Sequence, residues 1–247
     1  MSGAALAWEQ FRLERKLFWR NPSAAFFGFV LPMVLLVLLA STVASDQEDL
    51  EILIPGIAAL SVMATTFNSM AYSLTFLREQ GILKRLRGTP IPAPAYFTGF
   101  LGNAVANAFV QVALVVVVGH VVYDVAWPRD WIELVVFTIV GVITFGALGI
   151  ALSHVIPNFD SAPAYVNAIF LPAILISGVF YSAEGLPRAI EVVAEVLPLT
   201  HVVDGFADAI VEGRGLGHEL GALAVLAAWG AAGTILAVRG FSWNDEE

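Results

Sequence analysis

Residues 134–153 read LVVFTIVGVITFGALGIALS, and this stretch decides the fold class. It contains no Asp, Glu, Lys or Arg, and as a helix it is long enough to cross the roughly 30 Å hydrocarbon core of a bilayer. Five more windows share these properties: 24–44, 52–77, 95–123, 161–183 and 220–238. We therefore expect residues 1–247 to form one all-α membrane domain with six transmembrane helices.

The composition of the whole chain agrees with this class. Hydrophobic residues make up 58% and charged residues 13%, whereas soluble domains average roughly 45 to 50% and 25%. The loops between the windows are too short for a large soluble domain. The chain has no cysteine, which excludes disulfides, thiolate metal sites and cysteine nucleophiles.

The distribution of basic residues predicts the orientation. One side of the six windows has Arg12, Arg15, Lys16, Arg20, Arg78, Lys84, Arg85, Arg87 and Arg239, and the other has only Arg129, Arg188 and Arg214. By the positive-inside rule both termini and the 78–92 loop are cytoplasmic, and residues 184–217 are external. The charge is then −11 outside and +2 inside, in keeping with −9 overall. A signal peptide ending at Ala44 is the alternative, but its charged preface is unusually long.

The first 21 residues predict a helix of their own. Glu9, Arg12, Lys16 and Arg20 form one charged stripe at helical spacing, and Asn21-Pro22 ends the helix, since proline cannot continue the hydrogen-bond ladder. Residues 5–21 are therefore expected to be a cytoplasmic interfacial helix. Ordinary positive-inside flanking explains the same charges equally well.

Polar side chains inside the windows are candidates for a translocation path. Asn103, Asn107 and Gln111 recur at every fourth residue and cover an arc of about 80° on one helix face. Unpaired amides in lipid cost several kcal/mol, so this face must meet another helix or a water-filled path. Helix packing and a path are both open interpretations. The other candidates are Thr65, Asn68, Ser69, Tyr72 and Asn167.

The segment between the last two windows predicts an external amphipathic helical hairpin. Its first helix has Ile190, Val193 and Leu197 on one face, and after Pro198 a second has Val203, Phe206 and Ile210 opposite Asp204, Asp208 and Glu212. The acidic stripe is expected to face water or a pore mouth, as a solvated face or as a gate. His201 and Asp204 alone have too few partners to predict a metal site.

Motifs for ATP hydrolysis or other catalysis are missing from the sequence. It has no GxxxxGK[ST] phosphate loop and no Ser-, His- or carboxylate-based catalytic set, so we expect a transport subunit that binds no cofactor and is not an enzyme. The six windows also lack the charged residues of many gradient-driven carriers.

Two stretches resemble the type-2 ABC transporter permeases, and the similarity extends over nearly the whole chain. Residues 78–92, REQGILKRLRGTPIP, are similar to a cytoplasmic loop of that family, although Ile82 stands where many members have threonine. Residues 177–210 are similar to its fifth-span exit and Leu-Pro-Leu-Thr-His motif, here Leu197 to His201. The basic residue that often follows this motif is absent before Arg214.

The resemblance implies an exporter subunit of the cell membrane. Two permeases, expected here as a homodimer in the bilayer, would pair with two copies of a separate ATP-binding subunit that holds ATP and Mg²⁺, and no nucleic acid is involved. The coupling residues would be Arg78, Glu79, Gly81, Lys84, Arg85, Leu86, Arg87, Thr89 and Pro90, although the basic residues among them also suit simple topological anchoring. The external gate would comprise Ser177, Gly178, Leu197, Pro198, Thr200, His201 and Asp204, and Leu199 belongs to the matched motif beside them.

The substrate class is the least defined expectation. Spans with few polar groups favour a drug-like or lipidic compound over a polysaccharide. A gradient-driven secondary transporter and a membrane-embedded enzyme are the alternatives from other functional classes. The first would depend on an ion gradient and not on ATP, and the second would need a catalytic set.

Overall fold

The computed structural model describes residues 3–44, 46–82, 85, 93–181 and 187–240, in which it has helices and no strand. The α-helices are α1 (Gly3–Arg20), α2 (Pro22–Ala25), α3 (Leu31–Thr42), α4 (Gln47–Met63), α5 (Ser69–Glu79), α7 (Ala93–Tyr123), α8 (Trp131–Val155), α9 (Ala162–Ile176), α10 (Arg188–Val196), α11 (Pro198–Ala207) and α12 (Leu220–Gly240). The π-helical turns are η1 (Phe26–Val30), η2 (Ala64–Asn68) and η4 (Asp208–Glu212), and η3 (Phe159–Ser161) is a 3₁₀ turn.

Five helical segments in the described part of the chain are long and apolar enough to cross a membrane. They are Gln47–Glu79, Thr98–Tyr123, Trp131–Val155, Phe159–Ile176 and Leu220–Arg239. This confirms a multi-pass membrane protein of the all-α class. The first predicted window, 24–44, is represented by a shorter apolar helix, Gly28–Thr42, and the π turn η1 interrupts its α-helical geometry.

Local sequence signals account for where the helices begin and end. The Asp46 side chain accepts a hydrogen bond from the Asp49 N–H at the start of α4, and Asp130 accepts from the Ile132 and Glu133 N–H groups at the start of α8. These caps satisfy N–H groups that have no intrahelical partner. α8 ends before Ile156, which precedes Pro157 and so disfavours helical geometry.

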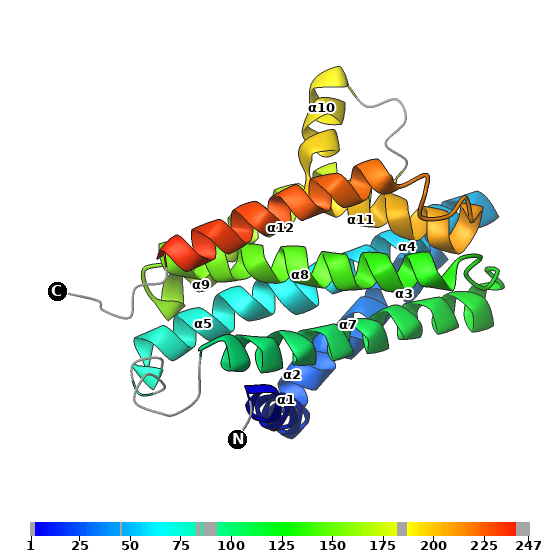
Figure 1. The fold of residues 1–247 in the computed structure, drawn as a ribbon. Coiled ribbons are helices and arrows are strands. Elements are labelled where there is room, and N and C mark those ends of the chain that lie inside the picture. Colours follow the sequence, from blue (N-terminus) through cyan, green and yellow to red (C-terminus); the bar gives the residue numbers. More distant parts are fainter. Residues whose placement is uncertain (1–2, 45, 83–84, 86–92, 182–186, 241–247) are drawn as a thin grey trace.

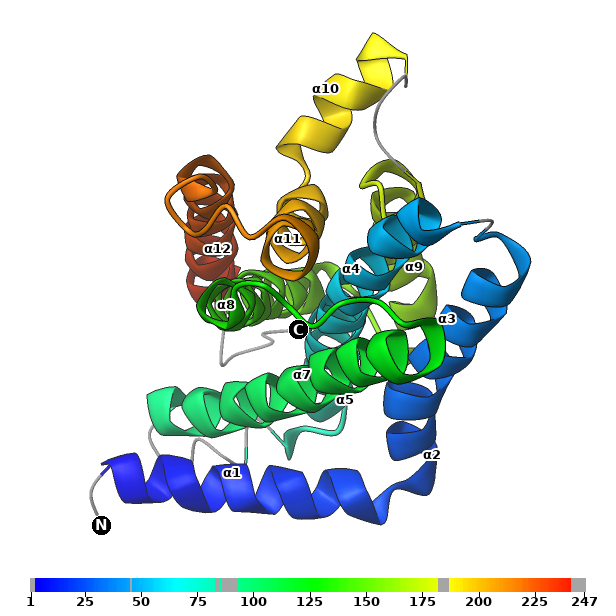
Figure 2. The same ribbon diagram turned by 90° about the vertical axis from the view of Figure 1, so that its right-hand side faces the viewer.

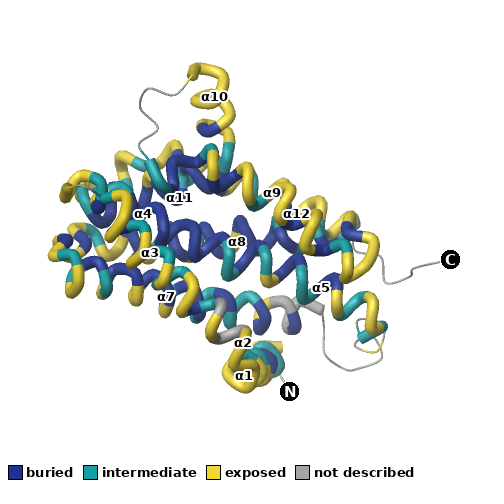
Figure 3. The backbone as a smooth tube through the Cα atoms, turned by 180° about the vertical axis from the view of Figure 1, so that it is seen from behind, coloured by how far each residue is buried: buried dark blue, intermediate teal, exposed yellow. Residues whose placement is uncertain are grey.

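The spanning segments run roughly side by side, and α1 crosses them (Figure 1). In Figure 2 α1 lies along one side of the bundle, next to α7, where Gly99 of α7 contacts Ala7 and Gln10 of α1. The buried residues concentrate in α4, α8 and α11, while α1, α10 and the outer faces of α9 and α12 are exposed (Figure 3). α4 and α8 are therefore the centre of the packed core.

The segment expected as an external hairpin consists of two helices in different environments. α10 projects away from the bundle (Figure 1) and exposes Ile190, Val192 and Val193. α11 is packed between α4, α8 and α12, and Leu199, Val202 and Phe206 are fully buried there. At ten residues α11 is about 15 Å long, half the thickness of a bilayer core. It is a core helix of the bundle rather than an amphipathic surface helix.

The prediction of an exposed acidic stripe is wrong for one of its three members. Asp204 and Glu212 are exposed, but Asp208 is fully buried. The chain that follows η4 folds back onto Asp208, because the Arg214 N–H donates to its carboxylate and the Gly213 N–H donates to its carbonyl oxygen. The charge of the buried Asp208 carboxylate is compensated by Arg214, whose Nε lies 3.0 Å from it.

The fifth spanning segment is shorter than the window 161–183. α9 ends at Ile176, and Gly178 follows with a φ of +70°, a left-handed conformation that glycine adopts without strain. The turn that begins there contacts α4 closely. A Cβ atom on Gly56 would lie 1.9 Å from the Val179 carbonyl oxygen, so only glycine fits at this crossing.

Candidate functional site: a cavity between the spans

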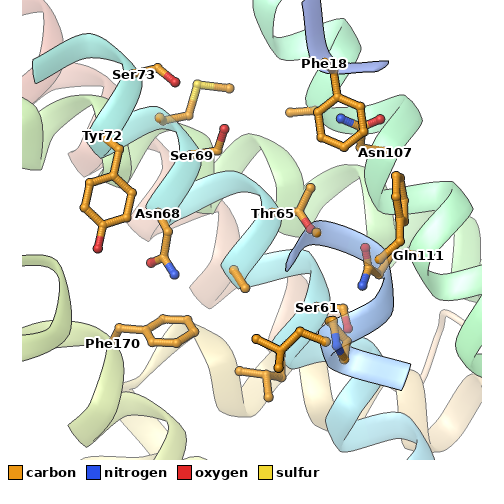
Figure 4. Close-up of a pocket in the computed structure, with 18 of the residues that line it drawn as sticks. Phe18, Ser61, Thr65, Asn68, Ser69, Tyr72, Ser73, Asn107, Gln111 and Phe170 are labelled. Atoms are coloured by element: carbon orange, nitrogen blue, oxygen red, sulfur yellow. The ribbon is translucent and has the colours of Figure 1, made fainter. Parts of the chain in front are cut away.

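A cavity of about 880 Å³ lies between the N-terminal helices and the spans. Its walls come from α1, η1, α3, α4, η2, α5, α7 and α9, and the turn after α9 adds Phe180. Figure 4 shows polar side chains of the second span and of α7 together with Phe18 of α1 and Phe170 of α9. The volume of the cavity is in the range of small-molecule binding sites.

The structure brings most of the predicted path residues together in this cavity. Those that line it are Thr65, Asn68, Ser69, Tyr72, Asn103, Asn107 and Gln111. Asn167 is the exception, because it is exposed on α9 and is not part of the lining. The three amides that recur at every fourth residue of α7 therefore all lie on the cavity wall. The prediction for Asn167 rested on a single residue without a periodic pattern.

Several of these amides lack hydrogen-bond partners within the described structure. The Oδ1 atoms of Asn68 and Asn103 are buried and unpaired, and Gln111 is fully buried with both amide atoms unpaired. Burying an unpaired amide costs about 1 to 3 kcal/mol by mutational measures. Hydroxyl groups in the spans avoid this cost, as Ser61 and Thr66 donate to the carbonyl four residues earlier. The orphaned amides therefore favour a ligand-binding or water-containing cavity over helix packing.

Two of the π turns lie at this cavity. η1 contributes Gly28 and Phe29, and η2 contributes Thr65 and Asn68. A π turn inserts an extra residue into the helix and so rotates the following side chains relative to a regular α-helix, which is why such turns are frequent at functional sites. The sequence does not reveal these turns.

The N-terminal helix contributes side chains that sequence reasoning did not place in the site. Arg15 donates to the Asn107 Oδ1 across 2.6 Å, and Glu14, the one charged residue among the described lining residues, accepts from the Gln10 Nε2. Burial raises the pKa of Glu14, with that hydrogen bond opposing the effect. Burial, reinforced by Glu14, raises the pKa of Tyr96 to about 12. Neither Glu14 nor Arg15 belongs to the charged stripe of α1. That stripe was the only pattern in this helix from which sequence reasoning could have selected site residues.

The predicted coupling loop begins where α5 ends. Arg78 donates from Nη1 to the Ser153 carbonyl at 2.8 Å and from Nη2 to the Ile156 carbonyl, while the Glu79 carboxylate accepts from the Phe159 N–H at 2.7 Å. Gly81 ends the helix with a φ of +65°. Arg78 and Glu79 thus bind the turn between α8 and α9. Arg85 is exposed, and Lys84, Leu86, Arg87, Thr89 and Pro90 lie outside the described residues.

The predicted gate residues, with Leu199 beside them, divide between the core and the surface. Ser177, Pro198, Leu199 and Thr200 are buried, and the hydroxyls of Ser177 and Thr200 have no hydrogen-bond partner in the described part of the chain. The His201 Nε2 lies 2.9 Å from the Glu195 carbonyl oxygen, linking α11 to α10. Asp204 is exposed. Gly178 is buried in the turn beside Gly56, and Leu197 is half-buried at the junction of the two helices.

Comparison with known proteins identifies a family and several relatives that this chain resembles. The family model described as "ABC-2 type transporter" matches residues 5–211. The chain is 21% identical over 159 residues to the inner membrane transport permease YadH of Escherichia coli strain K12, covering 64% of this chain and 61% of that protein. It is 26% identical over 176 residues (66% of this chain) to the probable multidrug ABC transporter permease YbhS and 27% over 188 residues (75%) to the corresponding permease YbhR of the same strain.

The chain spans about three fifths of YadH and 43% and 44% of YbhS and YbhR. The family match is more extensive on this chain, because it begins in α1 and continues through α11 into η4. It includes both stretches, 78–92 and 177–210, on which the resemblance rested, and so confirms it. The chain belongs to the ABC-2 type transporter family.

Proposed function

We propose that this chain is the membrane-spanning permease subunit of an ATP-driven ABC exporter. The observation that carries the proposal is the 880 Å³ cavity with its unpaired amides, in a chain of the ABC-2 family. A path for cargo needs polar groups that can exchange partners as the cargo moves. Asn68, Asn103 and Gln111 offer such groups without placing a charge in the membrane.

Coupling to ATP hydrolysis would pass through the end of α5. The 78–92 loop would dock on a separate ATP-binding subunit, and Arg78 and Glu79 would transmit its displacement to the turn between α8 and α9, which they already bind. Such a drive requires that the ATP-bound partner favour one permease conformation, since a ligand shifts an equilibrium only by its differential affinity. Glu79 is then a link within the permease as well as a docking candidate.

The assembly would contain two permeases and two ATP-binding subunits, with ATP and Mg²⁺ on the latter. The helical run from Pro22 to Thr42 supports a sixth crossing, since its 21 residues extend about 30 Å. An even number of crossings would place both termini in the cytoplasm. α3 and α9 border the cavity and expose Val34, Leu38 and Leu171, which would face lipid or the second permease.

The substrate we favour is a drug-like or lipidic compound. Apart from Glu14, the described cavity lining is uncharged and mostly apolar, with aromatic rings at Phe18, Phe29 and Phe170. The relatives YbhS and YbhR are described as probable multidrug ABC transporter permeases, in keeping with this choice. Export of a polysaccharide would call for a longer row of aromatic platforms.

The first experiment is gentle purification of the protein from its native membrane, mass spectrometry of stoichiometric partners, and an assay of ATP hydrolysis. A co-purifying ATPase with a phosphate loop is expected. If an intact preparation contains the chain alone, without ATPase activity, and transport depends on a proton or sodium gradient, the ABC proposal is wrong.

Within the intact complex, Glu79→Arg should reduce transport-coupled ATP hydrolysis several-fold, because it removes the acceptor of the Phe159 N–H and reverses the charge at the loop. The matched control is Glu51→Arg, an exposed carboxylate near the opposite end of the same continuous helical segment. Both variants should insert into the membrane. Unchanged coupling in Glu79→Arg would remove Glu79 from the transmission pathway.

A further inference from the structure

A second group of polar residues lies far from the cavity, at the end of the bundle where α8 and α12 begin. Glu133 is in the first turn of α8, Asp208 begins η4, and His218 and Glu219 immediately precede α12. The proposed path uses none of these residues. We refer to these four residues as the acidic cluster.

The atoms of the acidic cluster that can bind a metal are close together. One ligand atom each from Asp208, His218 and Glu219 lies within 4.8 Å of the other two. The His218 Nδ1 is 3.2 Å from a Glu219 carboxylate oxygen. Carboxylate oxygens and an imidazole nitrogen at this spacing can converge on one cation, which needs ligand distances of about 2 Å.

Glu133 supplies an independent observation at the same place. Its side chain is fully buried, and within the described residues neither of its carboxylate oxygens has a hydrogen-bond donor. The surrounding charges that act on it belong to Asp208, Asp130 and Glu219 and are all negative, and its carboxyl group lies within hydrogen-bond distance of the Asp208 carboxyl group. Buried carboxyl groups in such contact need a shared proton or a bound cation, because an isolated buried charge costs far more than a paired one.

Arg214 does not compensate the charge of the buried Glu133. Its guanidinium binds the Asp208 Oδ1 at 3.0 Å and lies 3.6 Å from a Glu219 oxygen, which leaves the buried Asp208 Oδ2 unpaired. Arg214 also pairs with Glu212, so its single positive charge is shared among three carboxylates. Among the described residues, Arg214 has no interaction with Glu133. The Asp208 Oδ2 and both oxygens of Glu133 therefore have no N–H donor in the described structure, and no cationic side chain contacts Glu133 there.

We propose that the acidic cluster binds one divalent transition-metal cation, of which Zn²⁺ is the best match, through Glu133, Asp208, His218 and Glu219. An imidazole with carboxylates favours Zn²⁺ over Ca²⁺ or Mg²⁺, which prefer all-oxygen sites. The ion would join the start of α8, the junction of α11 and η4 and the start of α12. Its effect would be to fix this junction against both spans.

The test uses the full-length protein in detergent, purified with a tag that contains no histidine, stripped with EDTA and titrated with Zn²⁺ by calorimetry. Saturable binding of about one ion per chain is expected, with a higher midpoint of thermal unfolding. The double variant His218→Ala/Glu219→Gln should bind at least about tenfold more weakly, since loss of even outer-shell partners costs 10- to 100-fold. His218 is exposed and Glu219 half-buried in a loop, so this variant should fold.

The matched control is His201→Ala/Glu195→Gln, which removes the same two side-chain types from α11 and α10 and should leave Zn²⁺ affinity unchanged. Glu133→Gln provides a second measurement: the variant should be monodisperse and lose Zn²⁺ affinity, because an amide is a poor substitute for the carboxylate. The proposal is overturned if the wild-type protein shows no saturable binding between pH 6 and 8, or if the His218/Glu219 variant binds as tightly as wild type.

Discussion

The cavity and the contact between α11 and the spans differ in the charge and the hydrogen-bond pairing of their buried polar groups. In the cavity the unpaired groups are neutral amides, such as Gln111, whose cost is moderate and whose partners can change. Around α11 and η4 the buried polar groups include the carboxylates of Glu133 and Asp208, and Asp208 is held by Arg214. Neutral polar groups are compatible with an open, exchangeable site, whereas buried charges need fixed partners.

Glycine contacts show the same difference in packing. Around α11 and its neighbours a Cβ on Gly56 would meet the Val179 carbonyl oxygen at 1.9 Å, and one on Gly205 would meet the Phe137 ring at 2.4 Å. Near the cavity, a Cβ on Gly28 or Gly102 would meet only a phenylalanine ring at 3.5 Å. In a membrane, close packing of this kind contributes more than the hydrophobic effect. The packing at Gly56 and Gly205 is therefore tighter than the packing at Gly28 and Gly102.

Gly56→Ala should produce the largest loss of stability, because the new methyl group clashes with a backbone carbonyl that cannot rotate away. Overpacking typically costs about 1 to 3 kcal/mol, which for a chain of this size lowers the unfolding midpoint by several degrees. Gly28→Ala is the control, with an ordinary contact at 3.5 Å. Fluorescence-detected gel filtration after heating measures both. Equal midpoints would show that the two halves do not differ in packing.

Gln111→Leu should separate stability from function. Replacing an unpaired buried amide with an apolar group of similar size removes a desolvation cost, so we expect stability unchanged or raised by up to about 1 kcal/mol. Transport by the intact complex should fall several-fold, if the amide contacts cargo. Val110→Leu, at a half-exposed position on the same helix, is the control for both measurements. A marked loss of stability in Gln111→Leu would mean that the amide is a structural group.

Glu14→Gln should have the smallest effect. Since burial raises the pKa of the Glu14 carboxyl in the folded state, the folded protein holds this proton more tightly than the unfolded chain does. Its contribution to stability is thus lost as the pH rises from 4.5 through the raised pKa. Glutamine cannot ionise, so the variant should be slightly more stable than wild type at pH 7 and equal to it below pH 4. Glu9→Gln, exposed on the same helix, should show no such pH dependence relative to wild type; identical profiles for both variants would contradict the buried position of Glu14.

Sequence reasoning worked where one helix could be considered alone. The amides at 103, 107 and 111 share a face at helical spacing, and all three line the cavity. The prediction for Asp208 was wrong because the turn after η4 folds back onto it, with the Arg214 N–H and side chain donating to its carboxylate. Asn167, a single residue without a pattern, lies on the exposed face of α9.

Charged residues near the helix ends were harder to interpret. Arg15, Arg78 and Arg214 were counted only as charges that set topology or docking, yet each bonds to a residue of another element or to a buried group. Glu133 lies one residue before an uncharged window, and nothing in the local sequence indicates that it is fully buried. Hydropathy gives no information about which charged side chain has a partner across the bundle.

The amino-acid sequence by itself determined that this is an all-helical, multi-pass membrane protein of the ABC-2 type, because uncharged stretches of bilayer length and short loop motifs are local properties. Only the tertiary structure decided that α11 is buried between α4, α8 and α12, that Arg15 reaches Asn107, and that the acidic cluster assembles from three distant segments. The physical reason is that periodicity defines the faces of one helix, whereas contacts between helices depend on packing over long sequence separations and on π turns that alter the phase.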